Sequence, residues 1–96
     1  MLPEKQQQKF NEFYDAARNS GTLDPKTTLL LHLAAAMALG CTPCMETYLA
    51  AAGKEGITAE EIGAAQAVVM AVAAGRVNAQ LREAERRMKK IGGCCG

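Results

Sequence analysis

The chain has 96 residues, enough for one domain with a modest core. Its formal net charge is only +1, so overall charge marks it for neither nucleic acid nor a membrane surface. Aromatic residues make up only 4% of the chain, and the apolar residues are mostly Ala, Leu, Val and Met, which favours closely packed helices. Because a domain this short buries a limited share of its surface, we expect copies of the chain to form a homo-oligomer.

Residues 3–19 have the periodicity of an amphipathic helix. Four apolar side chains recur at i, i+3, i+4 and i+7, namely Phe10, Phe13, Tyr14 and Ala17. We expect Gly21 to close this helix with a left-handed residue.

Asp24 and Pro25 predict the start of a second helix, because Asp is a good N-cap and Pro fits the first helical position. The helix runs to about Leu39 and is followed by Gly40. Since it is apolar on almost every side, we expect it to be the central, buried helix.

Thr42 and Pro43 repeat the same start signal and predict a third helix. Thr42 is the expected N-cap and Pro43 the first helical residue. We expect the helix to reach Ala52 and to end at Gly53 and Gly56.

A fourth helix is predicted from Thr58, because Thr58 and Glu61 match a capping box with Ile57 as the residue that precedes it. From Met70 onward the apolar residues follow a heptad-like rhythm, which requires a partner helix in the same chain or in a second copy. Gly75 is a candidate interruption of this helix.

No strand pattern or internal repeat occurs, so residues 1–96 predict a single all-α domain, a small bundle of about four helices. Residues 92–96 form a glycine-rich tail, expected to be flexible, that carries Cys94 and Cys95. The N-terminus lacks the features of a signal peptide, and the apolar run 29–39 is too short to cross a bilayer. We therefore expect a cytoplasmic protein with no membrane or nucleic-acid partner.

Cys41 and Cys44 lie at the mouth of the third predicted helix, where unsatisfied amides and the helix dipole favour a thiolate. A second Cys three positions away can resolve a mixed disulfide, so we interpret the pair as a redox-active dithiol. The alternatives are a buried structural pair or half of a zinc site, whose other ligands would be His32 and the tail cysteines. A thioredoxin fold is excluded because the neighbouring strands are missing. We expect neither a metal nor a cofactor.

Three segments in order carry a resemblance: 23–27, 38–44 and 52–62. Together they resemble the carboxymuconolactone decarboxylase family, most closely its alkylhydroperoxidase-D-like branch, over about residues 23–75. The resemblance implies an all-helical, oligomeric, thiol-based antioxidant protein with Cys41 and Cys44 as its dithiol. It also implies a peroxide or a partner peroxiredoxin as oxidant and a dihydrolipoyl-type reductant.

Two positions of the family's proton relay differ in this chain. A Glu is expected twelve residues before the first Cys, where Leu29 stands, and a His four residues after the second, where Tyr48 stands. Leu carries no proton and neutral Tyr is a poor base. His32 is a candidate replacement, although a core or interface histidine bonded to a carbonyl is the slightly better explanation. Tyr48 is either a hydrogen-bond donor to the site or a core residue. Glu46 is a further catalytic candidate, but the helix dipole explains its position better than catalysis does.

The sequence thus predicts a thiol–disulfide oxidoreductase, with peroxidase activity as a further expectation. The alternative is a non-catalytic oligomeric module in which the cysteine pair senses redox state or binds metal. Cys94 and Cys95 are either a second, mobile dithiol or incidental thiols at a frayed end.

Overall fold

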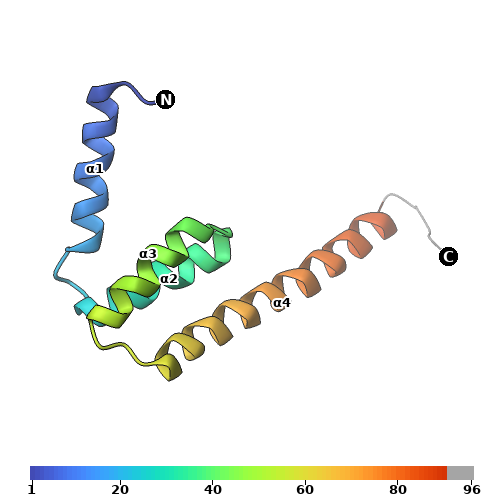
Figure 1. The fold of residues 1–96 in the computed structure, drawn as a ribbon. Coiled ribbons are helices and arrows are strands. Elements are labelled where there is room, and N and C mark those ends of the chain that lie inside the picture. Colours follow the sequence, from blue (N-terminus) through green and yellow to red (C-terminus); the bar gives the residue numbers. More distant parts are fainter. Residues whose placement is uncertain (91–96) are drawn as a thin grey trace.

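The computed structural model describes residues 1–90, and within this range it contains four helices and no strand. The helices are α1 (Glu4–Arg18), α2 (Pro25–Leu39), α3 (Thr42–Lys54) and α4 (Ala59–Lys90) (Figure 1). The prediction of an all-α chain with about four helices is confirmed. Cys94 and Cys95 lie outside the described residues.

The start of α2 is fixed by local hydrogen bonds, as predicted. The Asp24 carboxylate accepts the backbone N–H of Thr27 at 3.1 Å and also its hydroxyl, and these bonds lower the pKa of Asp24. Pro25 is the first helical residue. At the other end Gly40 adopts φ 73°, a left-handed conformation that favours glycine, and closes the helix.

The start of α4 is the predicted capping box. Thr58 N–H donates to Glu61 Oε1 at 2.9 Å, and Glu61 N–H donates to Thr58 Oγ1 at 3.1 Å. Glu61 also pairs with Lys26 at 2.9 Å, which joins the first turns of α2 and α4. The two helices therefore begin at the same end of the molecule (Figure 1).

Four predicted boundaries are wrong in detail. The N-cap of α3 is Cys41 rather than Thr42, and α3 continues through Gly53. Helix α1 ends at Arg18, so Gly21, with φ 79°, lies in the following turn and does not cap the helix. Helix α4 passes through Gly75 without a break, because one glycine costs only about 1 kcal/mol in a long helix.

The core is small and lies between α2 and α3. Its six buried residues are Leu29, Leu33, Ala36, Tyr48, Ala52 and Ile57. Helix α2 is central, as predicted, but it is only partly buried: Leu31 is 54% exposed and Leu39 84% exposed. Helix α3 covers one side of α2 and the first half of α4 another, and Tyr14 of α1 meets the His32 ring.

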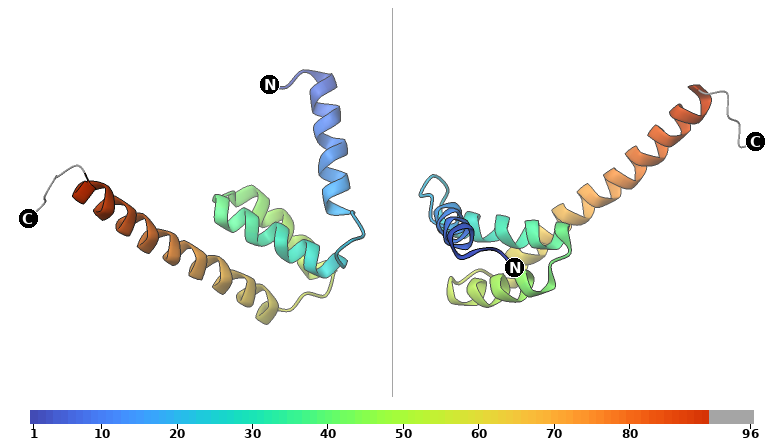
Figure 2. Two further views of the ribbon diagram at one scale, coloured as in Figure 1. Left: turned by 180° about the vertical axis from the view of Figure 1, so that it is seen from behind. Right: turned by 90° about the horizontal axis from the view of Figure 1, so that it is seen from above.

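The chain is open rather than globular. Its radius of gyration is 18.9 Å, whereas a compact chain of roughly this length has about 13 Å. Helix α1 stands away from the α2–α3 pair, and α4 leaves it and projects beyond its end (Figure 2). In the part of the chain that the structure describes, α4 alone is long and apolar enough to cross a membrane. In the predicted heptad-like seam of its second half, Val77 and Leu81 are exposed.

Candidate functional site: a dithiol and a Tyr–Tyr–His cluster

The cysteine pair lies at the junction between the end of α2 and the start of α3. Cys41 and Cys44 form a disulfide, with their Cα atoms 5.2 Å apart. The left-handed Gly40 turns the chain so that Cys41 N–H donates to Ala36 O at 2.9 Å, which satisfies the end of α2. The position of the pair is thus fixed by the end of α2 at Gly40 and the start of α3 at Cys41.

Cys41 caps α3 through its sulfur. The Cys41 Sγ accepts the backbone N–H of Cys44 at 3.3 Å, the role that an oxygen usually has in an N-cap. Both cysteines are half-buried, and Cys44 packs against the core. A negative charge on Cys41 Sγ would therefore face an amide donor and the positive end of the helix dipole.

Tyr48 lies one turn after Cys44 on α3 and is only 6% exposed. Its hydroxyl is hydrogen-bonded to the hydroxyl of Tyr14 on α1. Burial, together with this bond, raises the pKa of Tyr48 to about 12. Tyr48 therefore keeps its proton at neutral pH, where it is a hydrogen-bond donor or acceptor but not a general base.

His32 on α2 completes the cluster. Its ring meets that of Tyr48 edge-on at 5.2 Å between centroids, and that of Tyr14 at 6.2 Å. Its Nδ1 is 2.9 Å from the carbonyl oxygen of Thr28, so Nδ1 carries the hydrogen and Nε2 is left as the acceptor. Within residues 1–90 no hydrogen bond joins His32 to Cys41 or Cys44, so its role as a relay stays a prediction.

The other residues singled out by the sequence lie outside this cluster. Glu46 is exposed on α3 and bonds to neither sulfur. Leu29, at the expected relay position, is 7% exposed and belongs to the core. Sequence reasoning missed Tyr14, since its helical spacing predicted an apolar face but not that its hydroxyl would meet Tyr48. No three His, Cys, Asp or Glu side chains of residues 1–90 come together as a metal site requires.

A C-x-x-C disulfide at a helix N-terminus, on a scaffold without strands in its described part, defines a small helical thiol protein. A model of the carboxymuconolactone decarboxylase family matches residues 5–86, and the chain belongs to that family. The match includes α1, which the resemblance in the sequence had left outside. No curated protein and no solved structure matches the chain. The family includes alkylhydroperoxidase-like members.

Proposed function

We propose that the protein is a thiol–disulfide oxidoreductase of the alkylhydroperoxidase-D-like kind, with Cys41 and Cys44 as its dithiol. The observation that carries the proposal is the Cys41–Cys44 disulfide at the start of α3, with Cys41 Sγ facing the Cys44 amide. This environment favours a thiolate, the form of cysteine that attacks disulfides.

The exchange reaction needs only this pair and a disulfide substrate. The Cys41 thiolate attacks one sulfur of the substrate, so that a mixed disulfide forms and the first substrate thiolate leaves and takes up a proton. The Cys44 thiol loses its proton and attacks Cys41 Sγ, which releases the second substrate thiolate. The protein dithiol has then given two electrons, and the intramolecular disulfide seen in the structure is its oxidised product.

Cys41 is the better candidate for the attacking sulfur. It caps the helix, whereas Cys44 lies inside the first turn and packs against the core. Cys44 is then the resolving residue, already held within bonding distance of Cys41. The sequence alone left open which cysteine attacks, and this assignment rests on the hydrogen bonding and packing of the two residues.

The family resemblance supports a dihydrolipoyl-type reductant and a peroxide or peroxiredoxin as oxidant. In peroxide reduction the thiolate would attack one peroxide oxygen and break the O–O bond, which gives a sulfenic acid and an alkoxide that takes up a proton to become the alcohol. The thiol of the second cysteine would then attack the sulfenic acid, so that the disulfide closes and water leaves. In this scheme the candidates for handling the proton are the Tyr48 hydroxyl as donor and His32 Nε2 as acceptor. We expect this activity to be weaker than disulfide exchange.

The test is turnover with dihydrolipoamide as reductant and a small-molecule disulfide as oxidant. Wild type, Cys41→Ser and Cys44→Ser are compared, with a Cys94→Ser/Cys95→Ser double variant as the matched thiol control. The proposal expects loss of turnover in both single variants and retention in the control. Wild-type protein that binds Zn²⁺ tightly but shows no turnover would instead establish the non-catalytic alternative.

A further inference from the structure

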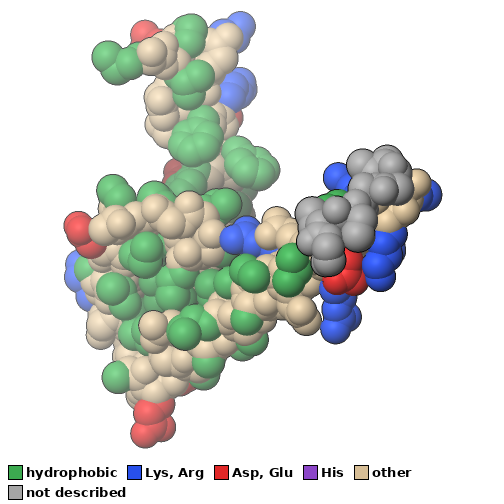
Figure 3. All heavy atoms as spheres, turned by 90° about the vertical axis from the view of Figure 1, so that its right-hand side faces the viewer, with side chains coloured by type: hydrophobic (Ala, Val, Ile, Leu, Met, Phe, Trp, Pro, Cys, Tyr) green, Lys and Arg blue, Asp and Glu red, His purple; other side chains and the backbone are tan. Residues whose placement is uncertain are grey.

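Charge is distributed unevenly between the end of α4 and the rest of the chain. Residues 76–90 contain six basic and two acidic residues, a net charge of +4, whereas residues 1–75 contain five basic and eight acidic residues, a net charge of −3. The overall charge of +1, from which no membrane partner was expected, averages these two opposite parts. Lys and Arg side chains gather at the end of α4 that projects beyond the α2–α3 pair (Figure 3). This end is therefore the positive pole of the molecule.

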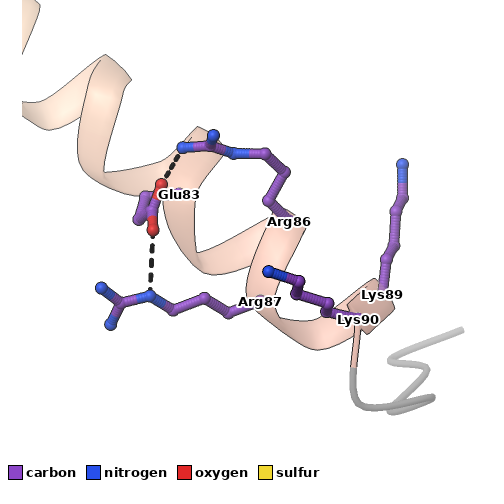
Figure 4. A pocket seen from close by; sticks show the side chains of 5 residues that line it. All are labelled: Glu83, Arg86, Arg87, Lys89 and Lys90. Atoms are coloured by element: carbon purple, nitrogen blue, oxygen red, sulfur yellow. Dashed lines mark hydrogen bonds and ion pairs between the residues drawn. The ribbon is translucent and has the colours of Figure 1, made fainter.

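The basic side chains of this end are only partly neutralised. Three of them form exposed pairs with an acidic residue one turn away: Arg86 and Arg87 with Glu83 (Figure 4), and Lys89 with Glu85. Such pairs contribute little to stability and can open for another anion. Arg82 and Lys90 form no ion pair with a side chain of residues 1–90. The hollow between the last side chains is lined by one helix alone, so it presents charge to a surface and does not enclose a small ligand.

The second half of α4 also carries an apolar stripe, which we call the outer stripe. Its members are spaced seven, four and seven residues apart and are Met70, Val77, Leu81 and Met88. At 3.6 residues per turn they lie within roughly 40° of one another around the helix. Val77 is 63% exposed and Leu81 69% exposed. The α4 residues that line the apolar groove against α2, such as Val72, lie on another face, roughly 130° away. The outer stripe is therefore not the face by which α4 packs on α2.

We propose that residues 70–90 lie in the plane of an anionic lipid surface, with the outer stripe among the acyl chains and the basic side chains at the phosphate headgroups. An apolar stripe opposite a basic face is typical of helices that bind at membrane interfaces. Arg87 and Lys89 flank the stripe on its two sides, at the level of the phosphates. This surface is separate from the dithiol, so the proposal goes beyond the exchange reaction.

Electrostatics orients the molecule on such a surface. The basic side chains on the far side of α4 are separated from the lipid by the width of one helix, about 10 Å. This width is close to the Debye length of about 8 Å, so these charges are still attracted by the anionic headgroups. Residues 1–75, with their net charge of −3, are repelled by the same headgroups. The end of α4 is therefore the part of the molecule that meets the lipid.

Other occupants of α4 fit these observations less well. A helix that spans the bilayer needs about 30 Å of apolar length, whereas the uncharged segment 62–75 covers only about 21 Å and is followed by Arg76. Nucleic acid would bind the basic side chains but leave the outer stripe in water. A partner helix would cover the stripe but would not account for the charge of +4 around it.

Vesicle co-sedimentation tests the electrostatic part of the proposal. At about 0.1 M salt, wild type is expected to bind phosphatidylcholine–phosphatidylglycerol vesicles about tenfold or more tightly than phosphatidylcholine vesicles. Arg82→Gln/Lys90→Gln removes two charges from α4 and is expected to weaken binding about twentyfold. Lys5→Gln/Lys54→Gln removes the same charge elsewhere and is the matched control, expected to stay within about twofold of wild type. Equal binding to both kinds of vesicle, or equal weakening in both double variants, would overturn the proposal.

The apolar part is tested in the same assay. Val77→Gln/Leu81→Gln is expected to weaken binding about tenfold or more, with helical content by circular dichroism unchanged. Leu23→Gln/Leu39→Gln, at sites that are 47% and 84% exposed outside α4, is the control and should bind as wild type does. Wild-type affinity in Val77→Gln/Leu81→Gln would show that the stripe stays in water. Wild type that binds a DNA oligonucleotide but no vesicles would assign the basic side chains to nucleic acid, and either result contradicts the proposal.

Tryptophan fluorescence tests the in-plane placement. The chain contains no Trp, so one introduced Trp reports on its own surroundings. Leu81→Trp, on the outer stripe, is expected to shift its emission to shorter wavelength when phosphatidylcholine–phosphatidylglycerol vesicles are added. Ala79→Trp, on the opposite face of the same helix, is the matched control and should not shift. A shift in both variants would indicate a helix surrounded by lipid, and a shift in neither would indicate a stripe in water; each outcome refutes the placement.

Discussion

The hydrogen bond between Tyr14 and Tyr48 is the main polar tie between α1 and the rest of the chain, and its removal has a calculable cost. Tyr14→Phe deletes the partner of a hydroxyl that belongs to a side chain only 6% exposed. A buried hydroxyl without a partner costs about 1–3 kcal/mol. Tyr48→Phe leaves the half-buried Tyr14 hydroxyl, which reaches water more readily, so we expect a smaller loss of about 0.5–1.5 kcal/mol.

The double variant separates the bond from the packing of the two rings. Because one substitution already breaks the bond, Tyr14→Phe/Tyr48→Phe is expected to lose less than the sum of the two single losses, with a coupling of about 1 kcal/mol. Urea unfolding followed by circular dichroism at one fixed protein concentration measures each value. Phe13→Leu on the same helix, at a site 73% exposed, is the control and should change little. Losses that add to within about 0.3 kcal/mol would refute the reasoning.

Three further outcomes follow from the local structure. Because the pKa of Tyr48 is raised in the folded state, its protonated hydroxyl contributes stability that is complete below pH 10 and is lost as pH rises through about 12. Absorbance at alkaline pH should therefore show one tyrosine that titrates late, and Tyr14→Phe should shift its titration to lower pH. Thr58→Ala removes the side-chain half of a capping box and should destabilise the protein by about 1 kcal/mol in urea, whereas Thr22→Ala in a turn should not. The added methyl group of Gly40→Ala meets no neighbouring atom within 4 Å, but the residue must keep φ 73°, which a side chain disfavours. We therefore expect thermal unfolding to show a free energy of unfolding lower by about 1–2 kcal/mol. Gly53→Ala, inside α3, is the control and should show no such decrease.

The features predicted correctly from sequence are those decided by a few neighbouring residues. Asp24 and Thr58 cap their helices through hydrogen bonds three positions long, and Gly40 ends α2 by its own φ. The same local logic failed at α3, because Cys41 is not among the usual capping residues although its sulfur accepts the same amide.

The features predicted wrongly depend on what surrounds each helix. Helix α2 is apolar on almost every side and was expected to be buried, yet Leu31 and Leu39 are exposed, since one chain covers only part of it. Composition shows that an apolar surface needs a partner, but not which element covers it. Tyr14 was missed for the same reason: its contact with Tyr48 joins residues 34 positions apart.

Proton handling distinguishes the two activities open to the dithiol. Leu29 contributes only core packing at the expected relay position, and Tyr48, with a pKa of about 12, holds its proton. The Tyr14 and Tyr48 hydroxyls are bonded to each other, and the His32 Nδ1 is bonded to the Thr28 carbonyl oxygen, so each group of the cluster already has a hydrogen-bond partner. Disulfide exchange has less need of a proton donor, because a thiolate is a stable leaving group at neutral pH. An alkoxide that leaves from a peroxide must gain a proton as the O–O bond breaks. Under the proposed function a helix-stabilised Cys41 thiolate would suffice for exchange, whereas peroxide reduction would also need a proton donor, for which Tyr48 and His32 are the candidates.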